Sequence, residues 1–230
     1  MADNFGKDAQ SLADVRVWDP LLRLCHWSFA LLIAAMWITA ENSQWAWHRR
    51  LGLILLGILV FRILWGFWGP ETARFGNFVK GPLAVIAYVR GQVADAAKQI
   101  GHSPLGGWST LALIAAMLAQ VSMGLFAGDP YDGMTGPLNP LVGVLTADML
   151  TNWHETFFWV LVGLIALHLS AITFYAVKGD DLLSPMVGGK RPPMRGVTGI
   201  GPLPWGRAGV AIVIAAGFAG WIAAGAPPLT

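Results

Sequence analysis

The chain has 230 residues, of which 55% are hydrophobic and 12% charged, and its formal net charge at pH 7 is +2. The mean hydropathy of +0.57 lies well above that of a soluble domain, so we expect most of the chain to be surrounded by lipid. Basic residues are scattered among the connections and form no dense patch, which excludes a nucleic-acid-binding protein.

The sequence begins with a polar segment and contains a single cysteine. Residues 1–20 have neither an apolar core nor a small-residue cleavage site, so they are predicted to be a cytoplasmic segment and not a signal peptide. Because Cys25 has no second cysteine to pair with, an internal disulfide and a thiolate-held cluster are excluded. We interpret Cys25 as a packing residue.

Five apolar segments are long enough to cross a hydrocarbon core of roughly 30 Å, which takes about 20 residues. They are residues 21–40, 51–69, 107–127, 153–177 and 208–224. In lipid every backbone amide must be satisfied within its own segment, and these runs lack the alternation of barrel strands, so all five are expected to be helices. The predicted fold class is all-α: an integral membrane bundle of four core helices and a fifth, C-terminal one.

The positions of lysine and arginine predict how the bundle is oriented. Basic residues occur before the first span, between the second and third, and between the fourth and fifth, whereas the connection 128–152 has none and includes three aspartates. We therefore expect a multi-pass protein with a cytoplasmic N-terminus. Its parts would be the segment 1–20, a four-helix core over 21–177, a cytoplasmic loop over 178–207, and the fifth helix with a tail on the opposite side over 208–230.

Three stretches outside the five predicted spans, or at their ends, allow further predictions. Arg49 and Arg50 follow a histidine on the translocated side, which suggests a bound anionic group, with ordinary interfacial arginines as the alternative. Residues 78–100 alternate apolar and basic positions at helical spacing, which is typical of a helix lying in the membrane interface, although a soluble-facing connector fits equally well. The segment 183–206 is rich in glycine and proline and is predicted to be a loop.

Four of the five histidines fall in or at the ends of predicted spans, where ionisable side chains are costly and usually functional. Counted from the cytoplasmic side, His26 lies roughly 7 Å inside the first span, and His48 lies at the opposite interface. His154 starts at that opposite level, and His168 follows it by 14 residues, roughly 21 Å deeper. In a core of about 30 Å, His168 therefore lies at the level of His26. Two pairs are predicted, His26 with His168 and His48 with His154.

The direction in which the histidines point favours ligation of haem iron. Each residue of a helix is rotated by about 100° from the one before, so a residue 14 positions further on is rotated by about 40° less than four full turns. His154 and His168 therefore point from the same side of one helix. Two axial imidazoles leave no open position on the iron, which indicates electron transfer and not oxygenation. The predicted cofactors are two haem b groups, bound without covalent attachment because Leu22 stands where a CxxCH motif needs its first cysteine. A zinc site would need more ligands at one level.

Three arginines next to the histidines are candidates for contacts with the haem propionates. Arg23 lies three residues before His26, on the same helical face, while Arg49 and Arg50 directly follow His48. Arginine pairs well with carboxylates because its guanidinium can donate two parallel hydrogen bonds.

Other neighbours have a functional and a structural interpretation. Gly52 and Gly163 would let a flat ring approach a helix backbone, although small residues are common wherever helices meet. Trp27 and Trp153 adjoin predicted ligands and are expected to pack on a porphyrin or to belong to the interfacial aromatic belt. His102 precedes the third span without an obvious partner, and it is predicted to be a loop histidine or a contact to quinone or propionate.

The sequence resembles the bacterial cytochrome b561 family, which includes the cytochrome b subunits of nickel–iron hydrogenases. The segments that carry the resemblance are VWDPLLRLCHWSFA around His26, HRRLGLILLGILVFRILWGFWGP from His48, GHSPLGGW from Gly101, GLFAGDP from Gly124 and HETFFWVLVGLIALH from His154 to His168. The resemblance implies the same two histidine pairs as haem ligands. It also implies electron transfer, in the bacterial inner membrane, between a quinone pool and a periplasmic partner such as a hydrogenase or a c-type cytochrome.

We therefore expect the haem at His48 and His154 to exchange electrons with the periplasmic partner, and the haem at His26 and His168 to serve quinone. The connection 128–152 is long and is expected to dock that partner. One alternative is a stand-alone quinone reductase that takes electrons from superoxide or uses another small oxidant, drawn in by the arginine pair that follows His48. The alternative outside redox chemistry is a histidine-relay transporter.

Overall fold

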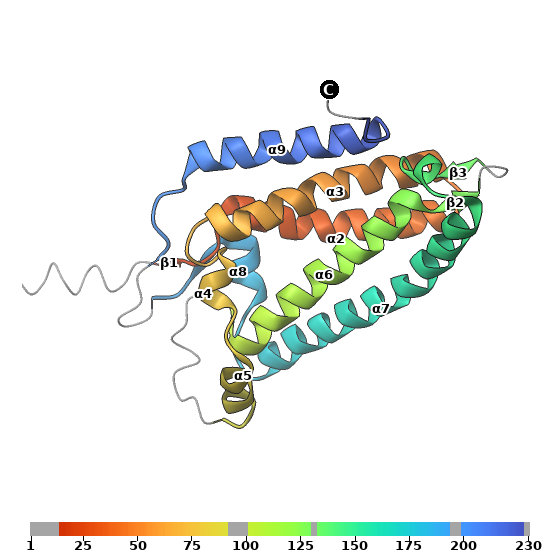
Figure 1. Ribbon diagram of the computed structural model, residues 1–230. Helices are drawn as coiled ribbons and strands as arrows, with labels where there is room; N and C mark the ends of the chain where they lie inside the picture. Colours follow the sequence, from red (N-terminus) through yellow and green to blue (C-terminus); the bar gives the residue numbers. More distant parts are fainter. Residues whose placement is uncertain (1–13, 92–100, 130–132, 194–198, 228–230) are drawn as a thin grey trace, which may run out of the picture.

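The computed structural model describes residues 14–91, 101–129, 133–193 and 199–227 of the chain. Five long helices make up most of this part (Figure 1): α2 (Pro20–Glu41), α3 (Trp45–Trp68), α6 (Pro104–Phe126), α7 (Val144–Val177) and α9 (Trp205–Ala223). Each is long and apolar enough to cross a membrane. The predicted all-α class and the five spans are thereby confirmed.

The helices run back and forth between two ends of the bundle (Figure 1). At the end where α2 begins, which we call the N-terminal end, lie β1 (Val15–Arg16), α4 (Phe75–Phe78), α5 (Pro82–Val89), α8 (Leu183–Gly188) and β4 (Lys190–Arg191). The opposite end holds the α2–α3 turn, β2 (Gly128–Asp129), β3 (Met134–Thr135) and the 3₁₀ helix η2 (Asn139–Leu141). The short strands form two antiparallel pairs, β1 with β4 and β2 with β3.

The helix α7 differs most from its predicted span. It begins at Val144 instead of residue 153 and has 34 residues, which makes it roughly 51 Å long, well beyond a core of about 30 Å. Polar residues interrupt the apolar run in the first turns of α7, so hydropathy alone predicts a start that is too late. One of them, Thr151, bonds to the Ala147 carbonyl oxygen and accepts a hydrogen bond from the Gly128 N–H, which ties the added turns to β2.

The glycine- and proline-rich segment 183–206 is more ordered than the predicted loop. It contains α8, and its β4 strand pairs Arg191 with Val15 and Lys190 with Arg16. Gly189 joins α8 to β4 with a φ of 82°, a conformation that glycine adopts without strain. The loop prediction is wrong over 183–191 because it rests on local composition, whereas the order comes from pairing with a strand that is distant in sequence.

A buried carboxylate anchors the start of α2. Asp19 is fully buried, and its Oδ1 accepts a hydrogen bond from the Leu22 N–H at 2.9 Å, which caps the helix. The indole N–H of Trp65, in α3, donates to both Asp19 oxygens at 3.3 Å. Cys25 packs in the same apolar cluster as a buried free thiol, as predicted. These contacts fix α2 against α3 at the N-terminal end.

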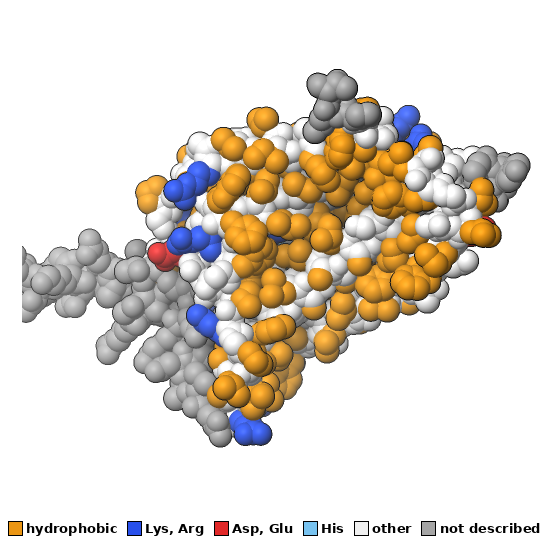
Figure 2. All heavy atoms as spheres, viewed as in Figure 1, with side chains coloured by type: hydrophobic (Ala, Val, Ile, Leu, Met, Phe, Trp, Pro, Cys, Tyr) orange, Lys and Arg blue, Asp and Glu red, His pale blue; other side chains and the backbone are white. Residues whose placement is uncertain are grey.

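The outer surface of the bundle is apolar along its length. Figure 2 shows hydrophobic side chains over the flank of the helices, with lysine and arginine near the ends. Within the segment 78–100, α5 is helical, and residues 92–100 lie outside the described ranges. The location of this helix in the membrane interface therefore stays a prediction.

Candidate functional site

Two histidine pairs lie at different levels of the bundle. His26 of α2 faces His168 of α7 with ring centroids 6.3 Å apart, and His48 of α3 faces His154 of α7 with centroids 6.1 Å apart. An imidazole nitrogen binds a metal ion at about 2 Å and its ring centre lies about 1 Å behind it, so two imidazoles on one iron have centres about 6 Å apart. Both pairs fit this spacing.

The rings of His48 and His154 are each held by a backbone carbonyl. Nδ1 of His48 donates to the Met36 oxygen of α2, and Nδ1 of His154 donates to the Gln120 oxygen of α6, both at 2.9 Å. A carbonyl oxygen can only accept, so Nδ1 carries the hydrogen in each ring and Nε2 is left with its lone pair. Metal-binding histidines are commonly oriented in this way.

Helix α6 carries no histidine, yet it positions His154. The side-chain amide of Gln120 donates to the His154 carbonyl oxygen at 2.8 Å, reciprocating the bond from the ring. One turn further along α6, a Cβ on Gly124 would lie 2.8 Å from Cε1 of His154. The ring of His154 thus occupies space that any larger residue at Gly124 would fill.

The pair at the N-terminal end is held differently. Nδ1 of His26 is buried and has no hydrogen-bond partner among the described residues. Trp27 meets the His26 ring edge-on at 5.1 Å between centroids and donates its indole N–H to the Met186 oxygen at 3.2 Å. Arg23, one of the three predicted propionate contacts, donates from Nη1 to the Val187 oxygen of α8, and its pairing with a propionate stays a prediction.

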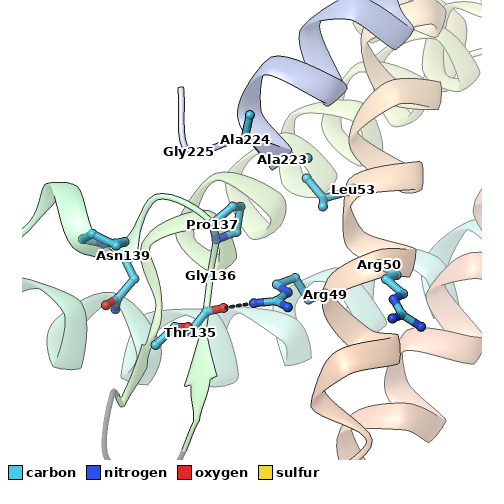
Figure 3. Close-up of a pocket in the computed structure, with 11 residues that line it drawn as sticks. Arg49, Arg50, Leu53, Thr135, Gly136, Pro137, Asn139, Ala223, Ala224 and Gly225 are labelled. Carbon is cyan, nitrogen blue, oxygen red and sulfur yellow. Dashed lines mark hydrogen bonds between the residues drawn. The ribbon is translucent and has the colours of Figure 1, made fainter. Parts of the chain in front are cut away.

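Arg49 and Arg50 line an open cavity of about 760 Å³ between the start of α3, the loop after β3 and the end of α9 (Figure 3). Arg49 points into it and donates to the Thr135 oxygen at 3.5 Å. The Arg50 guanidinium lies 5.1 Å from the centre of the Trp47 ring. The contacts found for these arginines are thus with the loop and an aromatic ring, and their pairing with haem propionates stays a prediction.

The two candidate glycines have different surroundings. A Cβ on Gly52 would lie 3.3 Å from the flexible end of Met36, and the approach of a haem to this glycine stays a prediction. A Cβ on Gly163 would meet nothing within 4 Å, although Gly163 lies on α7 between the two histidine levels. Close approach of a flat ring would account for that glycine. Trp153 is 61% exposed, as expected of an interfacial tryptophan.

His102 is packed between two aromatic rings just before α6. Its ring centroid lies 4.8 Å from that of Trp18 and 4.3 Å from that of Phe78. Burial lowers the pKa of His102 to about 3, and the nearby charge of Arg62 adds to the effect. The imidazole is therefore neutral at physiological pH, and its Nδ1 is buried without a hydrogen-bond partner among the described residues.

Gln120, Gly124 and Arg62 are not among the residues predicted from the sequence. Arg62 and Gln120 both lie inside apolar spans, where polar side chains are costly and often functional, so the same criterion that selects the histidines would have found them. Gly124 has no such signal, since a glycine in a membrane helix is common. Within the described ranges no cluster of three or more histidine, cysteine or acidic side chains could hold a metal ion on its own.

The chain is similar to known proteins over most of its length. The sequence profile described as prokaryotic cytochrome b561 matches residues 17–189, which include all four histidines of the two pairs and exclude α9. The probable Ni/Fe-hydrogenase B-type cytochrome subunit of Bradyrhizobium diazoefficiens is 22% identical over 224 residues, covering 83% of this chain and 91% of the relative. No solved structure matches the chain.

Proposed function

The chain belongs to the prokaryotic cytochrome b561 family, and on that basis we propose that it is a two-haem cytochrome that carries electrons between quinone and a periplasmic redox protein. The family and the relative support the coarser part of this statement, a multi-pass membrane protein with haem b that transfers electrons. They give no support to a histidine-relay transporter.

The proposal is carried by one observation: two separate pairs of histidines each have ring centroids just over 6 Å apart. His26 and His168 would hold one haem, and His48 and His154 the other. Helix α7 contributes one ligand to each site, which fixes their separation at 14 residues, roughly 21 Å of helix rise. The haem, when bound, supplies the one-electron chemistry, while the chain sets its orientation and surroundings.

The partners follow from the two ends of the bundle. The N-terminal end carries most of the basic residues, which supports a cytoplasmic N-terminus in the bacterial inner membrane. The opposite end would then face the periplasm, with the haem at His48 and His154 nearest to it and the haem at His26 and His168 serving quinone. The relative is named a probable hydrogenase cytochrome subunit, which supports a hydrogenase-like partner, with a c-type cytochrome as the alternative.

A reduced-minus-oxidised absorption spectrum of the detergent-solubilised full chain tests the proposal. We expect a b-type signal and two haems per chain by pyridine haemochrome, with no covalent attachment. Reduction of both haems by a quinol analogue is expected as well. One haem per chain would contradict the two-site arrangement, and a protein that binds no haem would overturn the whole proposal.

Docking of the periplasmic partner is proposed at the connection between α6 and α7. Helix α7 is longer than a membrane core requires, and Leu145, in its first turn, is 85% exposed. We expect Leu145→Asp to slow electron exchange between the haem and a purified hydrogenase or c-type cytochrome partner roughly tenfold, as loss of an apolar interface contact does. The matched control is Leu183→Asp, an exposed leucine of α8 at the other end. Equal rates in both variants and the wild type would contradict docking here.

A second candidate, a stand-alone quinone reductase that uses superoxide or another small oxidant, is favoured by the cavity that Arg49 and Arg50 line (Figure 3). Positive charge at an open cavity raises the local concentration of an anion. Addition of superoxide to the oxidised protein without any partner separates the two candidates. Rapid haem reduction that weakens in Arg49→Gln would favour the second, and no reduction would leave the first.

A further inference from the structure

Arg62 is a charged residue buried in the last third of α3, with 4% of its surface exposed. It follows His48 by 14 residues, the same spacing that separates His154 from His168. Over that length a helix rises roughly 21 Å and ends about 40° short of its starting direction. Helix α3 therefore presents His48 at one level and Arg62, on the same side, at the level of His168.

No carboxylate of the described residues forms an ion pair with Arg62. Among the described residues, Arg62 donates one long hydrogen bond, from Nη1 to the Ala73 oxygen at 3.5 Å. Its guanidinium lies 5.1 Å from the centre of the Phe75 ring. Asp19 is the buried acid of this region, but it already accepts bonds from Trp65 and from the backbone at the start of α2. A guanidinium cannot lose its proton, so burial without a close anion is costly.

Other nitrogens at the same end are also buried and without a partner among the described residues. They are Nε of Arg23, Nε of Arg74, Nδ1 of His26 and Nδ1 of His102. Arg74 directly follows Ala73, whose oxygen Arg62 contacts, and Arg23 lies one turn before His26. An arginine Nε always carries a hydrogen, so at least two of these atoms are donors that need an acceptor. Among the described residues of this end, the buried Arg62 and the half-buried Arg23 and Arg74 outnumber the one buried carboxylate, Asp19.

The other histidine pair has no comparable surroundings. His48 and His154 each satisfy Nδ1 with a carbonyl oxygen, and Arg49 and Arg50 are exposed. Buried, unpaired positive charge is thus confined, in the described part of the chain, to the level of His26 and His168. A ligand that satisfies it must be an anion with several acceptor oxygens, and carboxylates suit arginine best.

We propose that Arg62, with Arg23 and Arg74, binds the carboxylates of the haem held between His26 and His168, and that the charge of Arg62 raises the reduction potential of this haem. The proposal rests on the two-haem function above. Reduction adds one electron to the haem, and a fixed positive charge in a medium of low dielectric constant stabilises that electron.

Redox titration of the purified holoprotein tests the proposal, with Arg62→Gln compared with the wild type. The same substitution is also made in the His154→Ala variant, which is expected to keep only the haem at His26 and His168. At a fixed potential we expect the ratio of reduced to oxidised haem at this site to fall about tenfold, which corresponds to a midpoint about 59 mV lower. Arg62→Lys keeps the charge and should restore most of the loss.

The control is Arg207→Gln, which removes an exposed charge from the first turn of α9 and should leave both potentials unchanged. If Arg62→Gln proves unstable, Arg74→Gln is expected to shift the same haem in the same direction by less. Selective loss of this haem in Arg62→Gln, reversed in Arg62→Lys, would also support the proposal. Two unchanged potentials, or a shift confined to the other haem, would overturn it while leaving the two-haem function intact.

Discussion

His168→Ala is expected to reduce the haem content from two haems per chain to one. The variant removes the imidazole that faces His26 at 6.3 Å, and a haem with one remaining axial histidine at this site should be lost on purification. The pair of His48 and His154 is built from α3 and the first half of α7, so its haem should remain. The measurement is pyridine haemochrome per chain, together with the amplitude of the difference spectrum.

The matched variant is His154→Ala, which should spare the haem of the N-terminal end and remove the other. Its remaining haem should differ from that of His168→Ala in midpoint potential, because the two sites differ in buried positive charge. If either substitution removed both haems from a protein that is otherwise folded, or removed neither, the assignment of two separate histidine pairs would be wrong.

Gly124→Val is expected to disrupt the proposed haem site at His48 and His154 without replacing either histidine. A Cβ at this position would lie 2.8 Å from Cε1 of His154, a distance that real Cβ atoms essentially never show. The ring cannot yield easily, since its Nδ1 is bonded to the Gln120 oxygen and the Gln120 side chain binds the His154 backbone in return. A ligand displaced by as little as 1 Å no longer reaches the iron at bonding distance.

We expect Gly124→Val to lose most of one haem per chain and to retain the haem of His26 and His168. The control is Gly217→Val in α9, where a Cβ would meet nothing within 4 Å and haem content should stay at two. A Gly124→Val protein with two haems and an unchanged spectrum would show that His154 is not held in the position the structure gives it.

The sequence predicts those features of the fold that depend on a single segment of the chain. Apolar runs of about 20 residues predicted all five membrane helices, since lipid leaves the backbone no alternative to internal hydrogen bonds. The constant rise of a helix then placed His154 and His168 at two levels, and the structure brings each next to the histidine that depth selects. Helix ends were less well predicted, above all for α7, because its first turns are polar.

The class of the fold, the five apolar helices and the two levels of histidine can thus be predicted from the sequence, because hydropathy and helix rise are properties of single segments. How the histidines are held becomes visible only when the helices are packed together. The carbonyls that orient the His48 and His154 rings, the close contact of Gly124 with His154, and the lack of an ion pair at Arg62 among the described residues all depend on contacts between segments distant in sequence. Such contacts are set by packing and by the balance of buried charge, which no single segment contains.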